Sequence, residues 1–147
     1  RMATRPHPGR YGGGAVMQVG SIFVFGSNLA GRHGAGAAKY ALLKYGAVYG
    51  QGIGRQGDSY AIPTKDAALK TLPLDVIAGH VSDFAKYAAL HHDEAFVLTP
   101  IGCGLAGYNV TDIWEILHRV KLPYNVTLHG SWVNDHMPRA EKEARNG

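Results

Sequence analysis

Short apolar runs alternate with longer amphipathic segments along most of this chain. The runs are rich in β-branched and aromatic residues. They predict a strand buried on both faces over residues 21–25, a buried strand over 95–98 and further short strands over 59–62 and 126–128. Apolar residues at helical spacing predict helices over 73–90, with Asp75 in the first turn, and over 111–120. Small residues predict a closely packed helix over 35–43. Because strands alternate with helices, the pattern favours a three-layer α/β/α sandwich with a mixed, largely parallel sheet.

Proline and glycine mark the expected interruptions of these elements. Pro63 is expected to stop the second strand. Asn109 or Thr111 is expected to cap the helix over 111–120. Glycine recurs between residues 46 and 57, and we expect an irregular surface connection there.

The ends of the chain differ in composition from its middle. Residues 1–16 mix proline, glycine and arginine without an apolar period, and they are expected to form a flexible leader. Residues 138–147 are charged and predict a loose tail. The domain between them is expected to span residues 17–137. A chain of 147 residues suits a single domain.

Composition narrows the class of protein. Hydrophobic residues make up 46% and charged residues 18%, which is typical of a globular domain. The single cysteine, Cys103, cannot form an internal disulfide. No apolar run approaches the roughly 20 residues that cross a membrane, and no signal peptide is evident. These features predict a cytoplasmic protein without a membrane partner.

The net charge of +4 raises the question of nucleic-acid binding. Three arginines, Arg1, Arg5 and Arg10, lie in the first sixteen residues, which contain no acid. From Met17 onward the chain has twelve basic and eleven acidic residues, a net charge of +1. The domain therefore lacks the electrostatic footprint expected of a protein that binds a polyanion. Nucleic acid is not an expected partner.

Two glycine-rich loops, over residues 31–36 and 102–107, each follow a predicted strand and precede a predicted helix. Ligands of open α/β sheets sit at the carboxyl ends of strands. Glycine lets backbone N–H groups approach a phosphate, and the helix N-terminus favours an anion. The loops therefore predict a phosphate cradle; the alternative is a tight packing corner that needs small residues.

The dinucleotide-binding motif GxGxxG occurs at 52–57 and at 102–107. The first copy precedes a predicted strand, which is the wrong context. The second has the right context, but residues 121–131 contain no acid for a ribose hydroxyl. A Rossmann-like dinucleotide-binding protein therefore stays an alternative.

Three segments together resemble the macrodomain family, in particular a macrodomain-like subgroup found in phage and bacterial genomes. Residues 28–38, NLAGRHGAGAA, resemble the family's first loop, an asparagine and leucine before a glycine-rich turn that opens a helix. Residues 99–108, TPIGCGLAGY, resemble its second loop, which wraps the diphosphate. Residues 59–66, SYAIPTKD, resemble the intervening strand. The likeness spans residues 20–130, and it implies binding of ADP-ribose or a related nucleotide diphosphate between the two loops.

The resemblance implies that Asn28 binds the distal ribose, that the loops line the diphosphate, and that Tyr108 packs on that ribose. The expected ligand-binding residues are Asn28, Gly31, His33, Gly34, Ala35, Gly36, Gly102, Cys103, Gly104, Leu105, Ala106, Gly107 and Tyr108. The chain departs from the family in lacking the Gly-Asp-Ile segment that places an aspartate on adenine, and the paired glutamates of poly-ADP-ribose glycohydrolases.

Two functions remain open on this resemblance. One is a non-catalytic module of phage or bacterial origin that binds or sequesters a nucleotide signal, either ADP-ribose itself or ADP-ribosylated macromolecules. The other is a hydrolase of ADP-ribosyl derivatives, for which Asn28, His33 and Asp66 are the candidate catalytic residues, with Lys65 beside them. His33 is chosen because histidine is the side-chain type that ordinarily titrates near neutral pH. The other histidines lack ligand spacing, so no metal is expected. No cofactor is predicted either.

Overall fold

The structure is a computed structural model and describes residues 4–6, 16–18 and 20–132. Its main sheet has five strands. Their order across the sheet is β4 (Gly54–Gln56), β5 (Ser59–Lys65), β3 (Ile22–Asn28), β6 (Phe96–Leu98) and β7 (Val126–Leu128). β4 runs antiparallel to β5, and every other neighbouring pair is parallel.

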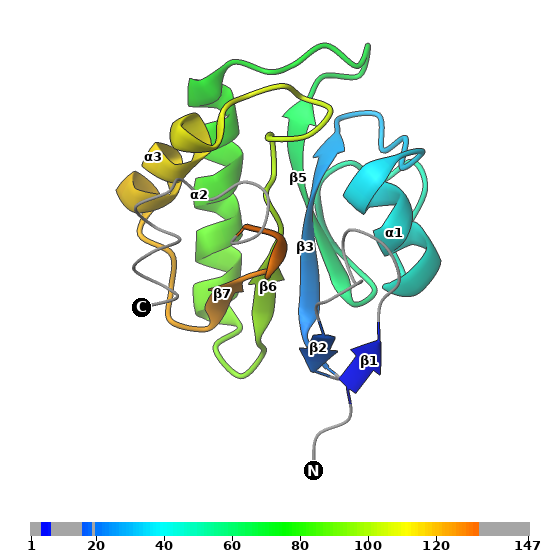
Figure 1. Ribbon diagram of the computed structural model, residues 1–147, viewed down its shortest axis with the longest axis vertical. Coiled ribbons are helices and arrows are strands. Elements are labelled where there is room, and N and C mark those ends of the chain that lie inside the picture. Colours follow the sequence, from blue (N-terminus) through cyan, green and yellow to red (C-terminus); the bar gives the residue numbers. More distant parts are fainter. Residues whose placement is uncertain (1–3, 7–15, 19, 133–147) are drawn as a thin grey trace.

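Helices cover both faces of this sheet. The helices α2 (Leu74–Leu90) and α3 (Val110–Val120) lie on one face, and α1 (Gly36–Lys44) lies on the other (Figure 1). Each begins and ends within a residue of its predicted bounds. Asn109 occupies the N-cap position of α3, although its side chain makes no capping hydrogen bond in the described structure. The prediction of a three-layer α/β/α sandwich with a mixed, largely parallel sheet is confirmed.

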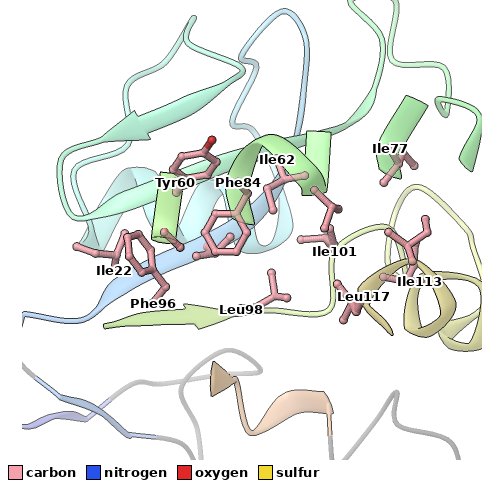
Figure 2. Close-up of a cluster of buried hydrophobic side chains, with 14 of the residues drawn as sticks. Ile22, Tyr60, Ile62, Ile77, Phe84, Phe96, Leu98, Ile101, Ile113 and Leu117 are labelled. Carbon is pink, nitrogen blue, oxygen red and sulfur yellow. The ribbon is translucent and has the colours of Figure 1, made fainter. Parts of the chain in front are cut away.

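Alternation along β3 divides the core into two clusters. Phe23 and Phe25 pack with α1, and their neighbours Ile22 and Val24 pack with α2 and α3. All four side chains are buried, because the strand has helices on both faces. Figure 2 shows the larger cluster, in which Phe84 of α2 sits among side chains of the sheet. The β-rich run at 21–25 therefore correctly predicted a strand buried on both faces.

Pro63 does not end the second predicted strand, and that expectation was wrong. β5 continues to Lys65, with Pro63 opposite Ser27 of β3. The Phe23 N–H donates to the Asp58 carbonyl (2.9 Å), and the alternation that follows turns the backbone nitrogen of residue 63 away from β3. β4 ends opposite Ala61, so no ladder bond is lost at the proline.

The glycine-rich stretch between residues 46 and 57 is not an irregular surface connection throughout, which corrects a second expectation. Its last part forms β4, and Arg55 anchors this edge strand by donating to the Glu94 carboxylate (3.0 Å) and to the Tyr87 hydroxyl (3.0 Å). Gly52 and Gly57 of this stretch serve close packing. A Cβ at Gly57 would lie 2.6 Å from the Gly46 carbonyl oxygen, so only glycine allows the two backbones to touch.

Two short strands lie within or beside the predicted leader. β1 (Thr4–Pro6) pairs antiparallel with β2 (Val16–Gln18), a pairing that the sequence pattern did not predict. The predicted tail at 138–147 lies outside the described residues. The division into leader, domain and tail stays a prediction. No helix among the described residues has the length and apolar character needed to span a bilayer.

Candidate functional site

The carboxyl ends of β3, β5 and β6 lie at one edge of the sheet, where the loops that follow them come together (Figure 1). Between these loops lies a cleft of about 800 Å³. Its described lining comprises Gly26, Ser27, Asn28, Arg32, Gly34, Ala35, Gly36, Ala37, Ala38, Thr64, Lys65, Leu69, Thr99, Pro100, Ile101, Gly102, Gly104, Leu105 and Ala106. Residues of both glycine loops therefore line one cleft.

Asn28 shapes the first loop through its side-chain amide. Its Nδ2 donates to the Arg32 carbonyl (2.9 Å), and its Oδ1 accepts from the Arg32 N–H (2.9 Å). Both polar atoms are thus used once inside the loop, and each retains capacity for one further bond. Asn28 lines the cleft, so a ligand contact at this position stays a prediction alongside the observed structural role.

The N-terminus of α1 opens on the cleft. Ala35 is the N-cap residue, and in the described structure no side chain caps this helix and no acid lies in its first turn. The first N–H groups of a helix lack intrahelical partners, and they carry the positive end of its dipole. A Cβ added at Gly34 or Gly36 would meet nothing within 4 Å, so space remains beside these amides.

The second loop turns tightly at its two ends. Gly102 has a positive φ of 73°, and the Tyr108 N–H donates to its carbonyl (2.9 Å). The Gly107 N–H donates to the Gly104 carbonyl (3.0 Å). Gly104 lies in the cleft lining, and a Cβ there would meet nothing within 4 Å. Backbone is therefore the surface that this loop offers to a ligand at Gly104.

Two cations supply the charge of the cleft. Among the described lining residues, Arg32 and Lys65 are the only ionisable side chains. Asp66 follows Lys65 but turns its carboxylate to its own loop, where Oδ1 accepts from the N–H groups of Ala68 and Lys70 (2.9 Å each). The lining therefore presents positive charge and no described carboxylate, a balance that suits an anionic ligand.

Eight of the predicted site residues line the cleft: Asn28, Gly34, Ala35, Gly36, Gly102, Gly104, Leu105 and Ala106. The structure does not bring the other predicted site residues to the lining, namely Gly31, His33, Asp66, Cys103, Gly107 and Tyr108.

His33 lies in the protein interior and not in the cleft. Its side chain is only 1% exposed, packed edge-on against Phe25 with ring centroids 5.2 Å apart. Its Nε2 bonds to Oε1 of Gln56 (3.1 Å), and in the described structure its Nδ1 has no hydrogen-bond partner. A group enclosed in this way cannot reach a ligand in the cleft without rearrangement, so this geometry gives no support to His33 as a general acid.

Gly31 and Tyr108 serve the framework of the two loops. A Cβ at Gly31 would lie 2.3 Å from the backbone nitrogen of Gln51, so glycine is required by close packing on the stretch before β4. The Tyr108 hydroxyl donates to the Leu72 carbonyl (2.6 Å), and its ring packs on the core. Cys103 is half-buried and packs against the same core. These contacts give the three residues a structural role, and a ligand contact at any of them stays a prediction.

Several lining residues were not singled out from the sequence. Leu69 carries no local motif, and it reaches the cleft only because the loop after β5 folds back on itself. Ser27 and Thr64 reach it because β3 and β5 continue further than the apolar runs indicated. The polar ends of both strands were the available signal. Within the described part of the chain, no three His, Cys, Asp or Glu side chains are grouped so that they could hold a metal ion.

No family model and no curated protein matches this sequence. Solved structures of similar shape exist. A protein of unknown function from Bacteroides thetaiotaomicron has a TM-score of 0.52 at 18% identity, covering 74% of this chain and 87% of its own. A second Bacteroides thetaiotaomicron protein has a TM-score of 0.47 at 18% identity, covering 74% and 88%. The macrodomain of Mycobacterium tuberculosis DarG has a TM-score of 0.49 at 16% identity, covering 80% and 94%. At these identities the likeness to the first protein is one of fold.

Proposed function

We propose that this protein binds ADP-ribose or a related nucleotide diphosphate in the cleft between the loops that follow β3 and β6. One observation carries the proposal: the cleft joins an uncapped helix N-terminus, a glycine backbone loop and two cations in a single cavity. Each of these features favours phosphate oxygens. The volume of about 800 Å³ lies within the roughly 300–1,000 Å³ range of small-molecule sites.

The resemblance of residues 28–38 and 99–108 to macrodomain loops supports ADP-ribose as the ligand within this class. In this pose the N-terminal amides of α1 hold one side of the diphosphate, and the backbone around Gly104 holds the other. Arg32 and Lys65 neutralise its charge from the walls. The Rossmann alternative gains little, because residues 121–132, which include β7, contain no acid for a ribose hydroxyl.

Capture of the ligand is favoured over its hydrolysis. General acid–base catalysis needs a group that can exchange a proton at the reacting bond. Among the described lining residues there is no carboxylate and no imidazole, since Asp66 holds its own turn and His33 is enclosed. Lys65 lines the cleft, and in this pose its charge is engaged by the diphosphate. The proposal is therefore a binding module, and the hydrolase hypothesis is left to a turnover assay with an ADP-ribosylated protein.

Calorimetric titration with ADP-ribose and with AMP tests this proposal. We expect ADP-ribose to bind with a stoichiometry of one and AMP to bind much more weakly, because AMP lacks the bridging diphosphate and the distal ribose. The same protein should release no detectable ADP-ribose from a modified substrate. Equal affinity for the two nucleotides would reject the pose, and measurable turnover would reject the binding-only reading.

A further inference from the structure

Two leucines from different loops border the same cleft. Leu69 lies in the loop after β5 and is 44% exposed, and Leu105 lies in the loop after β6 and is 71% exposed. A single exposed leucine is ordinary on a protein surface. Here two leucines line the same cleft as Lys65, so the cleft combines apolar and cationic side chains. The cleft is therefore amphipathic in the way that a ligand with a charged part and a ring would require.

The backbone of Leu69 adopts a conformation that is energetically unfavourable for leucine. Its φ is 66°, in the left-handed region that disfavours residues with a Cβ. A turn centred on Asp66 imposes this conformation. The Leu69 N–H donates to the Asp66 carbonyl (3.0 Å), and the Asp66 N–H donates to the Lys70 carbonyl (2.7 Å). Glycine or asparagine would fit this position with less strain, so local folding preference does not account for a leucine.

The two leucine-bearing loops are bonded to each other. The Thr71 hydroxyl donates to the Ala106 carbonyl (2.8 Å), and the Tyr108 hydroxyl donates to the Leu72 carbonyl (2.6 Å). Each bond joins a residue that lies within three positions of Leu69 in the sequence with one that lies within three positions of Leu105. The two leucines therefore form a single preorganised surface, and preorganisation lowers the entropic cost of binding.

We propose that Leu69 and Leu105 form a clamp that packs on the non-polar ring face of the nucleotide whose diphosphate the cleft holds. This inference rests on the proposed function and deepens it by naming the ligand class. A leucine side chain has no hydrogen-bonding atoms, so it contacts the face of a base or ribose and reads none of its polar edge. The clamp selects ligands that combine a diphosphate with a ring, and it discriminates weakly between adenine and guanine.

The test uses Leu69→Asn in the full chain, with ADP-ribose, its guanine analogue and inorganic pyrophosphate as probes. Asparagine has a similar size and tolerates the left-handed conformation, so the turn is retained. We expect both nucleotides to bind about five- to tenfold more weakly, the scale of partly burying one leucine side chain, while competition by pyrophosphate is unchanged. The parent protein should bind the two nucleotides with similar affinity.

Leu90→Asn is the matched control, because Leu90 is an exposed leucine (79%) at the end of α2 and outside the cleft lining. The melting temperature of the free protein gives a second readout. For Leu69→Asn and for Leu69→Gly it should be unchanged or higher, because the strained conformation is relieved. A purely structural leucine would instead lower the melting temperature when replaced.

The outcomes separate the two proposals. If ADP-ribose binds the parent protein and Leu69→Asn binds it equally well, the clamp is refuted and the proposed function stands. A loss of pyrophosphate competition equal to the loss of nucleotide affinity would also refute the clamp, since the ring would then contribute nothing. If the parent protein binds neither ADP-ribose nor pyrophosphate, both proposals fail.

Discussion

Gly104→Val is the substitution that separates ligand binding from folding most cleanly. A Cβ at Gly104 would meet nothing within 4 Å, and the residue is not among the glycines with positive φ. The branched side chain therefore fits the free protein, and we expect the free energy of unfolding to change by about 1 kcal/mol or less. In the complex the same side chain would occupy space that the backbone needs for its approach to phosphate.

The loss of affinity follows from the contacts that the valine prevents. A hydrogen bond from a backbone N–H to a charged oxygen is worth about 1.5–3 kcal/mol, so losing one weakens binding roughly ten- to hundredfold. Calorimetry with ADP-ribose measures this, and urea denaturation confirms the fold. Gly79→Val is the matched control, since Gly79 also has open space at its Cβ but lies in α2 outside the cleft lining. A folded Gly104→Val protein that binds ADP-ribose within about twofold of the parent would refute the phosphate cradle.

Three further predictions each concern a single residue. Lys65→Ala should weaken ADP-ribose binding and reduce its salt dependence, whereas Lys70→Ala, an exposed lysine outside the lining, should do neither; titrations at two salt concentrations check this. Gly52→Ala should lower the free energy of unfolding by about 1–3 kcal/mol in urea denaturation, because its Cβ would collide with the Asn28 carbonyl oxygen. Burial raises the pKa of Tyr60 to about 12, whereas an unfolded tyrosine ionises near pH 10. The unfolded state therefore loses its proton first, so stability should decline between pH 10 and 12, and less steeply in Tyr60→Phe.

The strands and helices of the central layers could be predicted from the sequence, because their apolar patterns are local. The apolar run at 21–25 lies between helices on both faces, and its continuous burial follows from that position. The three helices were found from spacing and small residues. The meeting of the two glycine loops also followed from a general rule, since parallel strands bring their carboxyl ends to one edge of a sheet.

The predictions failed where contacts between residues far apart in sequence decide the local structure. β4 consists of Gly54, Arg55 and Gln56, which have no apolar period, and it exists because β5 offers an edge and Glu94 binds Arg55. Pro63 is tolerated because β4 stops short of it. His33 looked like a polar loop residue, but its side chain is buried and hydrogen-bonded to Gln56 of β4. None of these partners can be identified from the residue's own neighbourhood in the sequence.

Backbone amide shifts in an NMR titration with ADP-ribose would locate the ligand on the two loops. We expect the largest shifts on the amides at the start of α1, over residues 34–38, and on the second loop, over residues 102–106. Amides at the opposite end of the sheet, such as those of residues 91–95, should stay in place. Saturable binding with its largest shifts outside both loops would refute ligand binding between them.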